Sequence, residues 1–311
     1  MDKILYKNII ATITYYDVLD RSLTAFEIWK HLIRYSGDDT RKIWSLTEVI
    51  SALHEEAITK YVSQKNGMYF LFGREGLTDL RRKREYISIV KMRKISRIVS
   101  ILRISPFVEM VCITGRLSYY NCDKESDLDV FVVYKYGHIW TGRFFLSMLT
   151  HILGVRRYGD KTNNRICLNY HVTTESMCVP TQDLFAANEY MLAIPVYDSA
   201  KYFLKFCKDN AWIQNYKPHY KCDQFKHALT MDDNGFTKFL KKALEVLFSD
   251  KGMEKRLEKF QQKKINKNPK TSQKGSLIMC SDKHLVFLPE PHGPKIFEEY
   301  KRRFDALELD F

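Results

Sequence analysis

The 311-residue sequence lacks any hydrophobic run near the roughly 20 residues that a helix needs to cross a bilayer, which argues against a membrane-spanning helix. It also lacks paired cysteines: its seven cysteines are scattered and contain no Cys-x-x-Cys motif. This pattern favours reduced thiols over a disulfide framework or a zinc site. The first twenty residues are too mixed and too acidic for a signal peptide. We therefore expect a cytoplasmic protein without a membrane partner.

The sequence has fewer acidic than basic residues: 37 Asp and Glu compared with 50 Lys and Arg, which gives a formal net charge of +13. Such a balance favours polyanionic partners, so nucleoside triphosphates and RNA are candidates. Residues 81–103 hold nine basic residues and one acid, and residues 251–275 hold nine basic residues and two acids. Solvated helix faces are an equally good explanation of both segments.

A chain of 311 residues suits two or three domains, and its 45% hydrophobic and 14% aromatic residues are enough to form packed cores. The expected fold class is mixed α+β. Residues 1–80 contain two capping boxes and an Asn-Gly turn, which predict three helices and a hairpin. That order is typical of a winged helix. It can bind nucleic acid through its third helix and wing, or it can be a docking module. The expected third helix carries three acids, which would repel phosphate: Glu48, Glu55 and Glu56.

The rest of the chain divides by pattern into three further parts. Residues 81–105 predict a basic linking helix with apolar residues along one face. Residues 106–181 read as strand, turn, strand, helix and strand, which predicts a mixed sheet. Residues 182–311 are expected to form a helical domain, with a basic mobile loop near 264–276.

Two carboxylates, Asp127 and Asp129, stand one residue apart at the start of an apolar strand. Residues i and i+2 of a strand point the same way, so the pair should project together about 7 Å apart. A divalent metal such as Mg²⁺, or Mn²⁺, would relieve their repulsion and keep sites for phosphate oxygens. Upstream, Gly115 ends another apolar strand, with Ser118 just beyond it. A glycine at such a turn lets backbone N–H groups approach a phosphate.

The stretch "ITGRLSYYNCDKESDLDVFVV" resembles the polymerase-beta-like nucleotidyltransferase superfamily over about residues 100–180. The family signature is Gly-Ser, a spacer of roughly ten residues, and Asp-x-Asp on the next strand. The whole chain also looks like uncharacterised bacterial proteins that place a winged helix before this domain and helices after it. The resemblance implies Mg²⁺-dependent transfer of a nucleoside monophosphate from an NTP to a hydroxyl or other acceptor. Asp127 and Asp129 would hold the metal. The nucleotide-binding residues would be Gly115, Arg116, Ser118 and Ser126.

Two departures from the family pattern bear on activity. Arg116 stands where the signature has serine. The third carboxylate of the family comes from a later strand, and the candidate strand, residues 165–174, carries Asn169 at its centre. Asn169 is therefore a candidate catalytic residue that brings no charge. Glu175, or Asp160, is an alternative third acid, whereas Glu189 is more simply explained as a helix-surface residue.

Three functions remain open at this point. The first is the nucleotidyltransferase, with RNA, protein or a small molecule as acceptor. The second is a catalytically degenerate module of the same fold that binds nucleotide or RNA without turnover. The third is a transcription regulator acting through the winged helix.

Overall fold

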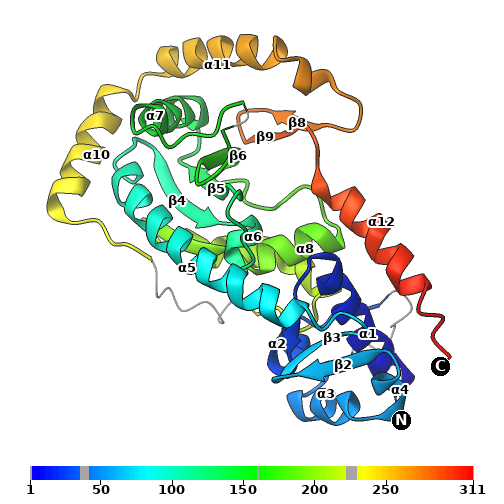
Figure 1. Cartoon of the computed structure of the whole chain (residues 1–311). Helices are drawn as coiled ribbons and strands as arrows, with labels where there is room; N and C mark the ends of the chain where they lie inside the picture. Colours follow the sequence, from blue (N-terminus) through cyan, green and yellow to red (C-terminus); the bar gives the residue numbers. More distant parts are fainter. Residues whose placement is uncertain (1, 36–41, 160, 222–229, 311) are drawn as a thin grey trace.

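The computed structural model describes residues 2–35, 42–159, 161–221 and 230–310 (Figure 1). It is a mixed helix-and-sheet protein with one small and one large sheet. This confirms the expected α+β class. Among the described residues, no helix combines the length and the apolar character needed to cross a bilayer.

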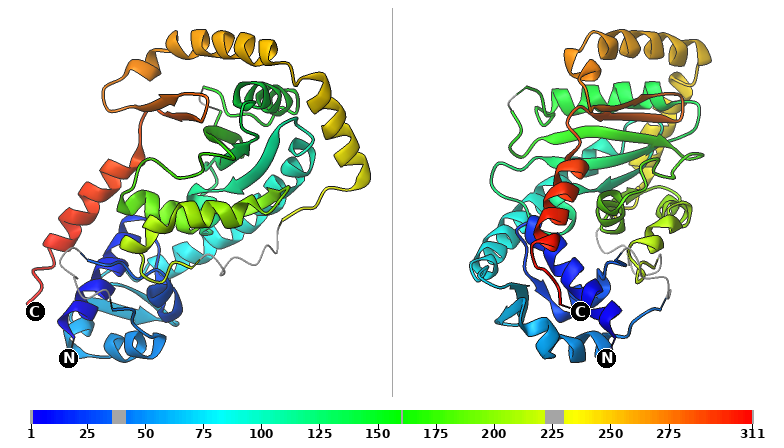
Figure 2. Two further views of the ribbon diagram at one scale, coloured as in Figure 1. Left: turned by 180° about the vertical axis from the view of Figure 1, so that it is seen from behind. Right: turned by 90° about the vertical axis from the view of Figure 1, so that its right-hand side faces the viewer.

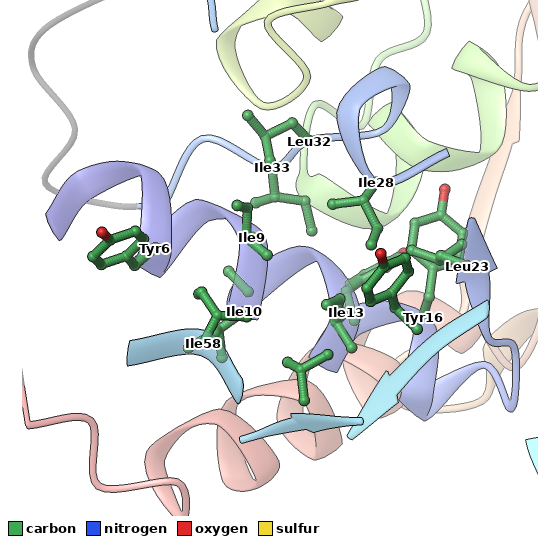
Figure 3. Close-up of a cluster of buried hydrophobic side chains, with 14 of the residues drawn as sticks. Tyr6, Ile9, Ile10, Ile13, Tyr16, Leu23, Ile28, Leu32, Ile33 and Ile58 are labelled. Atoms are coloured by element: carbon green, nitrogen blue, oxygen red, sulfur yellow. The ribbon is translucent and has the colours of Figure 1, made fainter. Parts of the chain in front are cut away.

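The N-terminal unit is built around a central buried helix, α1, and a small antiparallel sheet of order β1-β3-β2. Both predicted capping boxes form, one at the start of α2 and one at the start of α3. Figure 3 shows Ile9, Ile10 and Ile13 of α1 facing the residues that surround it. The elements are α1 (Lys3–Val18), β1 (Leu23–Thr24), α2 (Ala25–Lys30), α3 (Leu46–Leu53), α4 (Glu56–Thr59), β2 (Val62–Lys65) and β3 (Met68–Leu71).

The C-terminal helix α12 (His292–Asp305) also belongs to this N-terminal unit. Its Tyr300 and Phe304 are buried in the same core as α1, and Tyr300 meets Tyr15 edge to face at 5.7 Å. Figure 1 shows the red helix alongside the blue one. The expected boundary at residue 182 is therefore wrong for this helix, because its apolar face packs against a unit almost 300 residues earlier in sequence.

The predicted basic helix is α5 (Leu77–Leu102), which links the two sheets. Met92, Ile95 and Val99 line its buried face, as the sequence pattern predicts. Two of its basic side chains instead bind the N-terminal unit. Arg81 is buried and pairs with Glu27 at 2.6 Å. Arg84 donates to the carbonyl of Asp20 at 3.2 Å.

The large sheet has the strand order β7-β4-β5-β6-β9-β8, in which only β5 and β6 run parallel. One face packs on α5, α7 and α11, and the other packs on α8 and α9. Figure 2 shows the helices on both sides of the sheet. Its elements up to α9 are β4 (Val108–Ile113), α6 (Gly115–Ser118), β5 (Leu128–Tyr134), α7 (Ile139–Ile152), β6 (Ile166–Thr173), α8 (Leu184–Met191), β7 (Ile194–Asp198) and α9 (Tyr202–Asp209).

The region 182–311 is not the purely helical domain that the sequence predicts, since it supplies three strands of the large sheet. Pro195 lies inside β7 (Ile194–Asp198). This is an edge strand, where a missing N–H can be tolerated. The expected loop at 264–276 begins later, because α11 continues to Asn266. The remaining elements are η1 (Ala211–Asn215), α10 (Gly235–Leu247), α11 (Lys251–Asn266), η3 (Pro269–Ser272), β8 (Leu277–Cys280) and β9 (His284–Leu288).

Candidate active site

The paired carboxylates lie together at the start of β5, as predicted. Asp127 is the residue immediately before β5, and Asp129 is the second residue of β5. Leu128 and Val130 are buried on the α5 side of the sheet, so Asp129 points to the opposite face, which α8 covers. Oxygens of the two carboxylates lie within 4.8 Å of each other and of the Cys167 sulfur. The sheet register explains Cys167, because it pairs with Asp129 across the parallel β5–β6 ladder.

Asn169 also faces this cluster. Its side-chain amide donates to the Asp129 carboxylate at 3.4 Å. It follows Cys167 by two residues on β6. The position expected to hold a third acid is therefore close to the carboxylate pair, but it holds an uncharged amide.

Gly115 is required at the end of β4 because the Asp129 carboxylate lies directly against it. The residue has a left-handed φ of +62°, and a Cβ added there would lie 2.5 Å from Asp129 Oδ2. The neighbouring Thr114 N–H donates to the Asp129 carbonyl at 3.1 Å, which fixes the two strand ends relative to each other. Any residue larger than glycine would displace the carboxylate.

Glu189 of α8 reaches the same turn. Its carboxyl group lies close enough to the Gly115 backbone and to Asp129 for both to act on its pKa. Burial, together with the nearby Asp129 charge, raises the pKa of Glu189 to about 8. Burial and Asp127 likewise raise the pKa of Asp129 to about 7. Burial and the neighbouring carboxyl groups therefore favour the neutral forms of Asp129 and Glu189 while no cation is bound.

Arg157, in the segment before β6, supplies a positive charge next to Asp127. Its guanidinium donates to Asp127 Oδ2 at 2.5 Å and to the Cys167 sulfur at 3.4 Å. The Arg157 side chain is 44% exposed and that of Asp127 18% exposed, so the pair lies at the surface of the cluster. Sequence reasoning gave no signal for Arg157, because only the packing of the segment 153–158 beside β6 brings it to Asp127.

Of the other predicted nucleotide-binding residues, Arg116 and Ser118 lie in α6 and Ser126 lies in the loop between α6 and β5. Arg116 is exposed and pairs with Asp123 at 2.7 Å. Ser118 is buried and donates to the Gly115 carbonyl at 2.8 Å, so its hydroxyl holds the turn itself. Ser126 donates to the Asp123 carboxylate at 2.8 Å. Of these three, only Arg116 directs a charge that acts on Asp129, where it lowers the carboxyl pKa against the effect of burial.

A buried lysine of α5 orders the chain just before Asp127. The Lys91 ammonium donates to the carbonyls of Lys124 and Ser126 at 3.0 and 2.7 Å and to the Asn164 side chain at 3.1 Å. Burial lowers the pKa of Lys91. Lys91 therefore holds the backbone that leads into Asp127 in place.

Of the two alternative third acids, Glu175 lies away from the cluster, whereas Glu189, which was expected on the helix surface, is close enough for the Asp129 charge to act on it. Glu175 is exposed beyond the far end of β6, eight residues after Cys167 or about 26 Å along an extended chain. Asp160 lies outside the described residues. The third acid was expected on a strand, whereas Glu189 lies on α8. A helix residue reaches the strands only through tertiary packing, which the sequence does not show.

Comparisons of the chain with protein-family models, with curated proteins and with solved structures find no match.

Proposed function

We propose that the protein is a cytoplasmic nucleotidyltransferase that uses Mg²⁺ or Mn²⁺ to transfer a nucleoside monophosphate from an NTP to an acceptor. The observation that carries the proposal is the contact between Asp129 and Gly115. The Asp129 carboxylate, which lies beside that of Asp127, is directly against the backbone of this strand-to-helix turn. Metal and phosphate ligands are thereby adjacent, as transfer from a metal-bound triphosphate requires.

The donor set fits a hard cation. Asp127 and Asp129 offer carboxylate oxygens and Asn169 an amide oxygen, which suit Mg²⁺ or Mn²⁺. Cys167 is a poor ligand in comparison, since burial raises the pKa of its thiol and keeps it protonated. A bound metal would neutralise phosphate charge and acidify an attacking hydroxyl. Asp127 and Asp129 would hold it, while the Gly115 backbone and Arg116 would hold the phosphates.

The architecture supports this proposal at the level of the fold. In the N-terminal unit, the order of helices and strands and the β1-β3-β2 sheet agree with a winged helix. In the large sheet, antiparallel β4 and β5 and parallel β6 agree with a nucleotidyltransferase core. A fold by itself implies no reaction, so the proposed function depends on the residues of the site.

RNA is the acceptor that the charge distribution favours. The exposed face of α5 carries five basic side chains: Arg82, Lys83, Arg93, Lys94 and Arg97. Replacing these five with Ala should flatten the salt dependence of RNA binding, by about 0.7 in log–log slope for each lost single-strand phosphate contact. Replacing Arg81 and Arg84 instead should lower stability, because both bind the N-terminal unit.

A catalytically degenerate module is the second candidate, and Asn169 favours it. The amide stands where the resemblance leads us to expect the acid that activates the acceptor. Such a module would bind metal and nucleotide at the same residues without turnover.

The test is a screen of the purified protein with each labelled NTP, with Mg²⁺ or Mn²⁺, and with total cellular RNA or protein as acceptor. Metal-dependent label transfer that is lost in the Asp127→Asn, Asp129→Asn double variant supports the transferase. Nucleotide binding without transfer supports the degenerate module. The absence of both metal-dependent binding and transfer in the wild type would reject both.

A further inference from the structure

We propose that helix α10 is a docking face for an anionic lipid surface. The helix lies along the outer edge of the molecule (Figure 1). Its large apolar side chains are exposed and part of its polar side is buried, the reverse of an ordinary amphipathic helix. Such a helix lies in the plane of a membrane surface and needs no spanning segment. The expectation of no membrane partner rested on the lack of a spanning run.

The polar face of α10 is held against the large sheet by side chains at every fourth position. Thr237 and Lys241 are buried. The Lys241 ammonium donates to the Tyr197 hydroxyl of β7 at 3.1 Å, and the Glu245 carboxylate accepts from the Phe107 N–H at 3.0 Å. Because residues four apart share one face of a helix, these contacts fix the rotation of α10 about its axis and turn its opposite face to solvent.

This solvent-facing side of α10 is an apolar stripe. Its four large side chains are 68% to 72% exposed: Phe236, Phe239, Val246 and Leu247. Their spacing places them on one side of the helix, with the exposed Ala243 between them. The helix has 13 residues, so the stripe extends over about 20 Å. Single exposed apolar residues are common, whereas a contiguous row of large ones marks an interaction site.

The charge beside the apolar stripe is positive. Lys238 and Lys242 of α10 are exposed and border the stripe. Helix α11 follows after a short turn and begins with the exposed Lys251 and Lys255. Residues 235–266 hold nine basic and four acidic residues. The partner of this face should therefore combine negative charge with an apolar interior.

An anionic lipid surface meets both requirements. Its headgroups attract the lysines, and its acyl chains take up the apolar side chains. A second copy of the chain would bring the same positive charge against the lysines. RNA would attract the lysines, but its bases stack on aromatic rings, and Val246 and Leu247 carry none.

The test measures binding of the full-length protein to lipid vesicles by flotation. One set of vesicles contains phosphatidylcholine alone, and the other contains equal amounts of phosphatidylcholine and phosphatidylglycerol. The wild type should bind the anionic vesicles roughly tenfold or more tightly, because each lysine near an anionic surface contributes about fivefold. Added salt should weaken this binding.

The apolar stripe is tested with the Phe236→Ser, Phe239→Ser double variant. It should bind the anionic vesicles roughly tenfold or more weakly, because it removes apolar area that the acyl chains would cover. The matched control is the Phe72→Ser, Ile152→Ser double variant, since these side chains are 75% and 70% exposed on other parts of the surface. Its vesicle binding should equal that of the wild type.

The charges are tested with the Lys238→Gln, Lys242→Gln double variant. It should weaken binding to anionic vesicles by roughly tenfold or more and leave binding to neutral vesicles unchanged. The matched control is Arg93→Gln, Lys94→Gln on the exposed face of α5. This control should lower RNA binding and leave vesicle binding nearly unchanged. Thermal unfolding checks that all four double variants are folded.

Vesicle binding is independent of the nucleotide site, so Mn·ATP calorimetry of the α10 variants should match the wild type whether or not the proposed function holds. The inference is overturned if the wild type binds anionic vesicles no better than neutral ones. It is also overturned if replacing both phenylalanines leaves vesicle binding unchanged. RNA binding or self-association that depends on these phenylalanines, without vesicle binding, would assign α10 to that other partner and overturn the inference as well.

Discussion

Gly115→Ala should disturb the active site far more than it disturbs the fold. The new Cβ would lie 2.5 Å from Asp129 Oδ2 and 3.2 Å from Asp129 Cβ and Cγ. Because these are atoms of one short side chain, the Asp129 carboxylate must rotate away from the turn. Metal-dependent nucleotide binding should therefore weaken strongly, since a metal ligand and the backbone donor are displaced together.

The effect on stability has two parts. An alanine in the left-handed conformation costs about 1–2 kcal/mol relative to glycine. The forced rotation of Asp129 adds roughly 1 kcal/mol, the cost of an unfavourable side-chain angle. The Gly154→Ala control isolates the first part, because Gly154 has a φ of +64° but no atom within 4 Å of an added Cβ.

Urea unfolding and Mn·ATP calorimetry on both variants measure the two parts separately. We expect Gly115→Ala to be less stable than Gly154→Ala by roughly 1 kcal/mol, and only Gly115→Ala to lose nucleotide binding. Equal stability and equal nucleotide binding in the two variants would refute the reasoning, because the contact between Gly115 and Asp129 would then constrain nothing.

Three further substitutions test separate features of the structure. Asn169→Asp should lower metal-free stability by about 1 kcal/mol through repulsion from Asp129 and should tighten Mn²⁺ binding; an unchanged Mn²⁺ affinity would argue against a metal at this edge. Lys91→Met should cost about 1–3 kcal/mol, because three buried oxygens lose their donor, whereas the exposed Lys94→Met should cost little in the same thermal-unfolding assay. Lys217 is fully buried, which lowers its pKa from 10.5 to about 7, so between these values the unfolded chain binds more protons than the folded one. The unfolding free energy of the wild type minus that of Lys217→Met should rise between pH 7 and 10 by roughly 1 kcal/mol per pH unit; a difference independent of pH would contradict this.

Sequence reasoning predicted the parts of the site that depend on local geometry. The alternation of a strand is enough to bring Asp127 and Asp129 together. Asn169 was singled out by the resemblance, which expects a third ligand on a later strand, and its side chain lies beside Asp129. The glycine at position 115 permits the left-handed turn observed there.

The residues that sequence reasoning missed reach the site through contacts between distant segments. Cys167 depends on the register of β5 against β6, and Glu189 on the packing of α8 against the sheet. Neither register nor packing leaves a periodic signal in one chain. The same limit applies to charge, because the sequence could not distinguish buried Arg81 and Lys91 from the exposed basic residues of α5.

The fold was mispredicted where short strands lie among helices. β7, β8 and β9 have four or five residues each, too few for alternation to stand out, and β7 contains a proline. They were recognisable only from the partners they pair with in the large sheet. Helix α12 was likewise identified as a helix, but its partner α1 lies at the other end of the chain.

The central claim is that Asp127 and Asp129 bind a divalent metal together with a nucleotide. The most direct measurement is the affinity of the wild type and of the Asp127→Asn, Asp129→Asn double variant for each NTP, in Mg²⁺ and in EDTA. We predict that Mg²⁺ strengthens nucleotide binding to the wild type and has no effect on the double variant, which should remain folded by circular dichroism. A metal role for Asp127 and Asp129 is wrong if the wild type binds nucleotide no better in Mg²⁺ than in EDTA, or if the double variant keeps the full effect of Mg²⁺.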